Sequence, residues 1–168
     1  MGKHLFTLAA VIALAVAATA TYLYAEAPPR FPASFTVGGT THNFTAVAYT
    51  TAQQKKGLMN STVTNGTFML FAFQRPYRWG FWMKDTYAPL DMIWVYGNES
   101  GGKVVYVQHD ALPCIGYDPG QSNCTVYTPY QIANYVIEAQ AGFAQKSGSR
   151  TAHMSRSAIA PEAVSART

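Results

Sequence analysis

Residues Gly80 to Asp91 read G-F-W-M-K-D-T-Y-A-P-L-D, and this stretch is the most informative part of the chain. Three bulky apolar side chains lead directly into Lys84, Asp85 and Thr86, and a Pro-Leu-Asp turn follows. A soluble domain rarely places such apolar side chains next to charged ones without a structural or a binding reason. The stretch therefore indicates a core strand that ends at a turn carrying a candidate site.

The runs on either side of this stretch have the composition of β-strands. Phe68–Phe73 is continuously apolar, as expected of a strand buried on both faces, and Gln74–Trp79, which contains a proline, is expected to be a polar turn. Asp91–Tyr96 and Lys103–Gln108 flank a Gly-containing break, which predicts a β-hairpin. Tyr135–Glu138 could belong to a strand or to a helix, and its Tyr-Val-Ile cluster favours the last strand of the fold.

Turn-forming residues frame a second hairpin and a helix. Gly38-Gly39 separates Phe35–Val37 from Phe44–Tyr49, which predicts a hairpin. Thr51 to Gly57 predicts a helix of about two turns, with Thr as the N-cap and Gly at its end. Short strands with closely spaced turns and little helix predict a mainly β fold, a sandwich or barrel with one or two short helices.

The N-terminus has the features of a membrane-targeting segment. Lys3 and His4 precede an uncharged apolar stretch from Leu5 to Ala25, and Ala18-Thr19-Ala20 fits a signal-peptide cleavage site. The same stretch is also long enough to cross a bilayer, so a retained anchor is the open alternative. Both interpretations place the rest of the chain outside the membrane, either extracellular or at the cell surface.

Composition divides the chain into four parts. Residues 1–25 are the signal peptide or anchor, and the proline-rich residues 26–33 are expected to be a linker. Residues 34–146 are expected to form the β domain. Residues 147–168, in which Ser, Ala, Arg and Thr dominate, are expected to be a mostly disordered tail.

The cysteines agree with an exported chain. Cys114 and Cys124 are the only two, and in an exported protein such a pair is most simply one disulfide within the loop Pro113–Tyr130. The alternative is a pair of free buried thiols. Two cysteines are too few for a structural zinc site.

The asparagines give a third indication of export. Of the six asparagines, five lie in N-x-Ser/Thr sequons, whereas chance predicts about one. The alternative is that Asn and Thr simply occur together in polar turns. The candidate glycosylation sites are Asn43, Asn60, Asn65, Asn98 and Asn123.

Charge and motifs exclude several classes of function. Charged residues make up only 12% of the chain, and its net charge of +4 is dispersed, so nucleic acid is not an expected partner. The chain contains neither a Gly-x-Ser-x-Gly elbow nor a Gly-rich phosphate-binding motif. We therefore assign no catalytic residue and expect neither a metal nor an organic cofactor.

An ordered set of motifs resembles the DUF192 family, a widespread group of small, often exported domains of unknown function. The matching blocks are Gly57-Leu58-Met59, Met69-Leu70-Phe71, Phe81–Thr86, Pro89-Leu90-Asp91 and Tyr135–Glu138. The resemblance spans roughly residues 35 to 145 and implies a compact, mainly antiparallel β-sandwich of jelly-roll type. The family usually has Asn where this chain has Asp85, and its C-terminal Gly-Asp turn is not recognisable after Gly142.

The polar residues of these blocks are the candidate ligand-binding site. A partly buried Lys84 with nearby carboxylates could act as a binding clamp or as an acid–base set. The alternative is that Lys84 and Asp91 form an ion pair that fixes a turn, with Thr86 bonded to the backbone. The candidate residues are Trp82, Lys84, Asp85, Thr86, Asp91 and Glu138.

These observations predict a non-catalytic binding domain at the cell surface, with a cleft near Lys84 and Asp91 and a ligand or surface partner that is unknown. One alternative is a structural surface subunit that self-associates, with Pro28–Val37 added as a strand to a neighbour's sheet. Another is an enzyme of unknown reaction that uses Lys84 with Asp85 or Asp91.

Overall fold

The computed structural model describes residues 12–14, 16, 31–98, 101–116, 124–148 and, by their backbone, 151–155. It divides into two units, residues 1–30 and 31–168. In the first unit residues 12–14 and 16 are helical, and the rest of the predicted leader and linker up to residue 30 lies outside the described residues. No helix within the described part is long and apolar enough to cross a bilayer.

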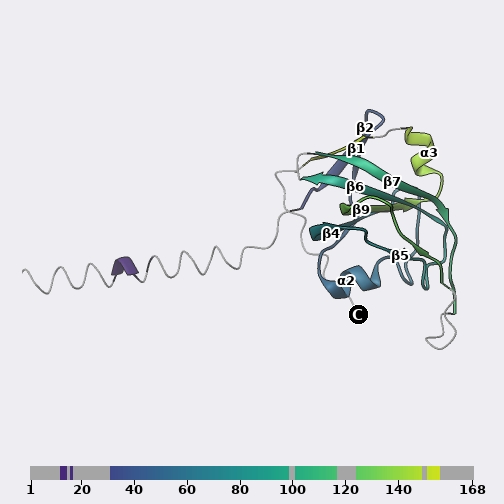
Figure 1. Cartoon of the computed structure of the whole chain (residues 1–168), viewed down its shortest axis with the longest axis horizontal. Coiled ribbons are helices and arrows are strands. Elements are labelled where there is room, and N and C mark those ends of the chain that lie inside the picture. The colour runs from purple at the N-terminus through teal and green to yellow at the C-terminus, as the bar shows by residue number, and fades with distance from the viewer. Residues whose placement is uncertain are drawn as a thin grey trace, which may run out of the picture. The chain divides into compact units, whose positions relative to one another are not determined.

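The second unit is mainly β, with a large sheet, a small sheet and two short helices (Figure 1). The strands of the large sheet are, in spatial order, β2 (Thr40–Asn43), β1 (Ser34–Val37), β10 (Thr151–Ser155), β7 (Gly101–Ala111), β6 (Leu90–Asn98), β9 (Ala133–Gln140), β4 (Phe68–Tyr77) and β3 (Ala46–Ala48). All neighbours pair antiparallel except β3 and β4. Among the described strands the sheet does not close into a barrel, because β2 and β3 remain at its two edges.

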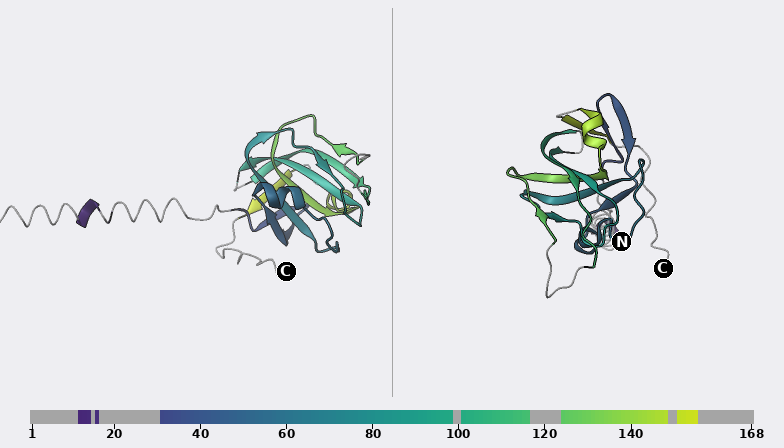
Figure 2. Two further views of the ribbon diagram at one scale, coloured as in Figure 1. Left: turned by 90° about the horizontal axis from the view of Figure 1, so that it is seen from below. Right: turned by 90° about the vertical axis from the view of Figure 1, so that its right-hand side faces the viewer.

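The small sheet consists of β5 (Phe81–Trp82) and β8 (Val126–Tyr127), which pair antiparallel. The helices are α2 (Thr51–Lys56) and α3 (Phe143–Ser147). Figure 2 shows them on the outside of the strands. The predicted mainly β fold with short helices is thus confirmed.

Alternation along the central strands buries both faces of the large sheet. Leu70, Ile93 and Ile137 belong to a first cluster on one face, whereas Phe71 and Trp94 belong to a second cluster on the other. Because residues i and i+1 of a strand point to opposite faces, a strand covered on both sides needs apolar residues throughout. This confirms the interpretation of Phe68–Phe73 as a strand buried on both faces.

The predicted helix is also confirmed. Its N-cap is Thr50, one residue before the expected Thr51, and Thr50 and Gln53 form a reciprocal capping box. Gly57 ends the helix with a φ of 47°, and a Cβ there would lie 3.2 Å from the ring of Phe71. Glycine is therefore required at this position by both backbone and packing.

Two strand boundaries differ from the prediction. β4 continues through most of the expected turn Gln74–Trp79, and its proline is tolerated because the register with β9 is interrupted between Ala72 and Tyr77. The turn at Gly38-Gly39 is confirmed, but the second arm of that hairpin is β2 rather than Phe44–Tyr49. The chain instead turns toward β4, because the Thr45 hydroxyl donates to the carbonyl of Phe68 and accepts from its N–H.

The expected tail contains a strand. β10 pairs with β1 on one side and with β7 on the other, so the prediction of disorder over 147–168 is wrong for residues 151–155. The composition of this segment does not predict a strand, because backbone hydrogen bonds to two neighbouring strands can order a segment whatever its side chains. Residues 149–150 and 156–168 lie outside the described part.

Candidate functional site

The motif that ends in Lys84 forms a strand segment at the side of the second cluster. Phe81 and Met83 are buried in that cluster, whereas Trp82 is 38% exposed and Lys84 is half-buried. The alternation is that of a strand with one face on the core. It directs Trp82 and Lys84 to the same outer side, where the Lys84 Nζ lies 5.9 Å from the centre of the Trp82 ring. This is within the range of a cation–π contact.

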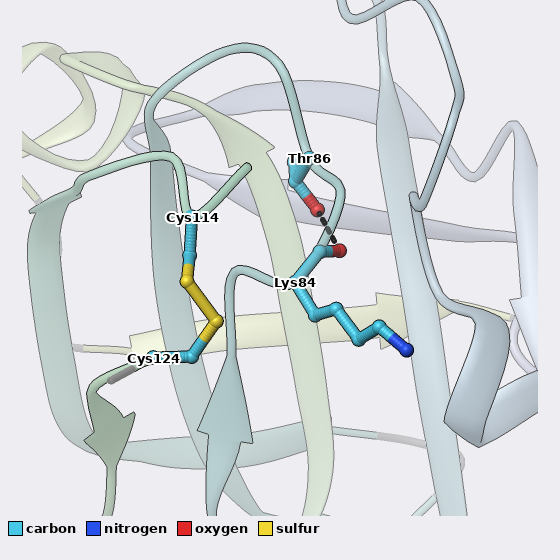
Figure 3. The surroundings of a disulfide bond; sticks show 4 residues. All are labelled: Lys84, Thr86, Cys114 and Cys124. Atoms are coloured by element: carbon cyan, nitrogen blue, oxygen red, sulfur yellow. Dashed lines mark hydrogen bonds between the residues drawn. A yellow bond between two sulfur atoms is a disulfide. The ribbon is translucent and has the colours of Figure 1, made fainter. Parts of the chain in front are cut away.

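A disulfide joins the two chain segments that are hydrogen-bonded to this strand segment. Cys114 and Cys124 are bonded, with their Cα atoms 5.7 Å apart, which confirms the predicted pairing. The N–H of Cys114 donates to the carbonyl of Met83 at 3.1 Å, and the N–H of Asp85 donates to the carbonyl of Cys114 at 2.9 Å. β8 follows Cys124 directly and pairs with β5. Figure 3 shows the Lys84 side chain extending away from the disulfide.

Lys84 lines an open concavity of about 710 Å³. Its other lining residues are Lys55 and Lys56 at the end of α2, Met59, Asn60 and Ser61 in the turn that follows, and Trp82. Three lysines and no carboxylate line it among the described residues, so the local field favours an anion. Trp82 and Met59 add an apolar surface at the same place.

One backbone and one side-chain hydrogen bond connect the two walls of the concavity. The N–H of Asn60 donates to the carbonyl of Asp85 at 2.8 Å, and the Tyr87 hydroxyl donates to Asn60 Oδ1 at 2.7 Å. Asp85 has a φ of 48°, a left-handed conformation in which Asp and Asn are favoured. Thr86 is buried, and its hydroxyl donates to the carbonyl of Lys84 at 3.2 Å. The predicted bond from Thr86 to the backbone is therefore confirmed.

Asp91 lies apart from this concavity. It is fully buried, and its carboxylate accepts from the N–H of Asp110 at 3.0 Å and from the N–H of Ala144 at 2.8 Å. His109 Nδ1 is 4.0 Å from Asp91 Oδ1. Asp91 thus joins β6 to the end of β7 and to the first turn of α3, and it is not among the described residues that line the concavity around Lys84.

Glu138 is buried in the second cluster, opposite Met69 of β4 and Met92 of β6. Its Oε2 has no hydrogen-bond partner among the described residues. Burial without a compensating charge raises the pKa of Glu138 to about 8, so the carboxyl is neutral at pH 7. A Cβ on Gly57 would lie 3.9 Å from Glu138 Oε2, which places this carboxyl just behind the end of α2.

The structure therefore brings together some of the predicted site residues and separates others. Trp82 and Lys84 share the concavity, and Asp85 and Thr86 shape its backbone. Asp91 and Glu138 are interior groups outside the residues that line it. The lysines of α2 and the turn Met59–Ser61 were missed, and the available signal was the Gly57-Leu58-Met59 block directly after a lysine pair.

Comparisons with known proteins give a family and a fold. The family model of DUF192, described as an uncharacterized ACR, matches residues 33–153. A crystal structure of a proposed transcription regulator from Sinorhizobium meliloti is 25% identical, with a TM-score of 0.57 over 76% of this chain and 95% of that one. A protein of unknown function from Novosphingobium aromaticivorans is 29% identical, with a TM-score of 0.56 over 77% of this chain and 92% of that one. Among curated proteins none matches this chain.

Proposed function

Because this chain belongs to the DUF192 family, whose activity is unknown, we propose that it is a non-catalytic binding domain that takes an anionic ligand in the concavity around Lys84. The observation that carries the proposal is the gathering of Lys55, Lys56 and Lys84 around the exposed face of Trp82. A ligand with a carboxylate or phosphate group and an apolar, planar part complements such a surface.

The arrangement favours binding over catalysis. Asp91 and Glu138 are not among the described residues that line the concavity, since Asp91 accepts from backbone donors and Glu138 is an interior group. Of the two acid–base pairs in the enzyme hypothesis, the one between Lys84 and Asp91 is therefore not supported. A half-exposed Lys beside an aromatic ring instead offers a charge and a flat surface, which is sufficient for recognition.

The subunit hypothesis also loses its basis in the strand it invoked. Residues 34–37 pair with β2 on one side and β10 on the other, so they are not a free strand for a neighbour. Strand addition through this segment would require the large sheet to open.

We also propose an extracytoplasmic location for this chain and a jelly-roll sandwich for its β domain. An apolar leader and a disulfide support an extracytoplasmic place, either released or anchored. The jelly-roll sandwich implied by the family is supported by the second cluster, in which Phe81 of the small sheet packs with Phe71 and Trp94 of the large sheet.

The test uses benzoate as an anionic aromatic probe and benzyl alcohol as its uncharged counterpart. We expect benzoate to shift the NMR signal of the Trp82 indole N–H saturably and benzyl alcohol to shift it far less. Replacing Lys84 by Met should weaken benzoate binding several-fold, because one of three cations is lost. Lys103→Met is the matched control, since Lys103 is an exposed lysine outside the concavity. Equal binding of both probes, or an equal effect of both substitutions, would overturn the proposal.

A further inference from the structure

The asparagines of this chain fall into two groups that the structure separates by exposure. Four of the five sequon asparagines are described, and all four are exposed: Asn43, Asn60, Asn65 and Asn98. The fifth, Asn123, lies outside the described residues. Asn134, which has no sequon, is half-buried, and its amide donates to the carbonyl of Gly97 at 2.8 Å and accepts from the N–H of Gly97 at 3.0 Å. Of the five described asparagines, the half-buried one is therefore the one without a sequon.

Three of the exposed asparagines lie at turns or strand ends where an added group meets no core. Asn43 is the last residue of β2, at the edge of the large sheet. Asn65 lies in the turn before β4, and Asn98 ends β6 at its hairpin with β7. A large polar group attached at these positions would extend into solvent without burying apolar surface.

Two of the sequon threonines have another explanation, because their hydroxyls form hydrogen bonds within the fold. Thr45 bonds to the backbone of Phe68, and the Thr67 hydroxyl accepts from the N–H of Thr64 at 2.9 Å. These contacts explain why Thr occupies those two positions. They do not explain the asparagines two residues earlier, since the side-chain amides of Asn43 and Asn65 make no hydrogen bond among the described residues.

We propose that Asn43, Asn65 and Asn98 carry N-linked glycans. The donor is an oligosaccharide joined through a diphosphate to a lipid on the outer side of the membrane. The amide nitrogen bonds to the anomeric carbon, and the bond from that carbon to the diphosphate breaks. The lipid diphosphate leaves with the electron pair of that bond and takes up the proton that the amide releases. The inference rests on the extracytoplasmic location in the proposed function and not on its ligand.

Asn60 distinguishes the glycosylation proposal from the proposed binding of an anion in the concavity. It lines the concavity, and its Oδ1 accepts from Tyr87, so a glycan on Asn60 would fill the place where the anionic ligand is expected. Occupancy of Asn60 together with the three other sites would support glycosylation and count against the concavity as a binding site. Unmodified Asn60 beside three occupied sites is consistent with both.

The experiment is mass spectrometry of the protein isolated from the cells that make it. Intact mass and glycopeptide mapping should show the same added mass on the peptides of Asn43, Asn65 and Asn98, and an unmodified Asn134. Each of N43Q, N65Q and N98Q should remove one increment of mass. T45S is the matched control, because serine keeps both the sequon and the hydroxyl that bonds to Phe68. Unmodified asparagine at all three positions would overturn the inference, even if benzoate binding succeeds.

Discussion

The central strands and the region that carries Lys84 are ordered in different ways. In β4, β6 and β9 each strand has a partner on both sides, and apolar residues fill both faces of the sheet. The Lys84 region, here called the stapled arm, comprises β5, β8 and the segment from Met83 to Asp85 that bonds to Cys114. Its two strands pair only through Phe81 with Tyr127 and Trp82 with Val126.

This difference indicates that the two regions depend on different interactions for their stability. A two-residue ladder is too short to be stable alone, so the arm depends on its disulfide and on the burial of Phe81 and Met83. Phe81 and Met83 tie the arm to the second cluster, which also contains Phe71 and Trp94 of the central strands. The candidate concavity thus takes Trp82 and Lys84 from the arm, and its other lining residues come from α2 and the turn that follows.

The largest effect should come from Trp94, where the two regions meet. Trp94 is fully buried, its Nε1 donates to the carbonyl of Trp79 at 2.9 Å, and its ring packs edge-on against Phe81. Trp94→Ala should lower the free energy of unfolding by about 3–5 kcal/mol, measured by chemical denaturation. Tyr130→Ala should change it by less than about 0.5 kcal/mol, because Tyr130 is 86% exposed. Comparable losses would mean that Trp94 does not join the two regions.

A pH titration of stability should sharpen the description of the central strands. The pKa of Glu138 is raised from 4.5 to about 8 in the folded state, so between these values the unfolded chain has released a proton that the folded protein retains. Stability should therefore fall as pH rises through this window, by about 1.4 kcal/mol per pH unit, or about 3 kcal/mol between pH 5 and pH 7. Glu138→Gln should remove this dependence. An unchanged slope in the variant would assign it to another group.

Opening the disulfide should affect the arm first. Replacing Cys114 and Cys124 together by Ser should cost about 2–3 kcal/mol, because the sequence separation of 10 residues closes a short loop. Hydrogen exchange should show lost protection at the N–H of Asp85, which donates to Cys114, and retained protection at Ile137. Equal loss at both amides would mean that the two regions unfold as one unit.

The smallest effect should come from the cap of α2, which adjoins the concavity. Thr50→Ala removes the bond to the N–H of Gln53 and should cost about 1 kcal/mol. Thr50→Ser keeps the hydroxyl and should leave the thermal midpoint nearly unchanged. If the alanine variant also matches the wild type, the capping box does not contribute to stability.

Local patterns predicted the strands but not how distant segments meet. Phe68–Phe73 was predictable because a doubly buried strand leaves a continuous apolar run, and Trp82 and Lys84 were predictable from an apolar run that meets a charge. Lys55 and Lys56 were not, since the bond from Asn60 to Asp85 that brings them near Lys84 spans 25 positions of sequence. The surroundings of Asp91 were not predictable, because the backbone donors that satisfy it, at Asp110 and Ala144, carry no signal in residue type.

The position of β10 has a consequence for biosynthesis. The first two strands of the chain are hydrogen-bonded to the remaining strands, within the described part of the sheet, through the last one. The sheet therefore cannot be completed while residues 151–155 are still in the ribosome or in a translocation channel. Until residues 151–155 emerge, β1 and β2 lack the strand that links them to β7.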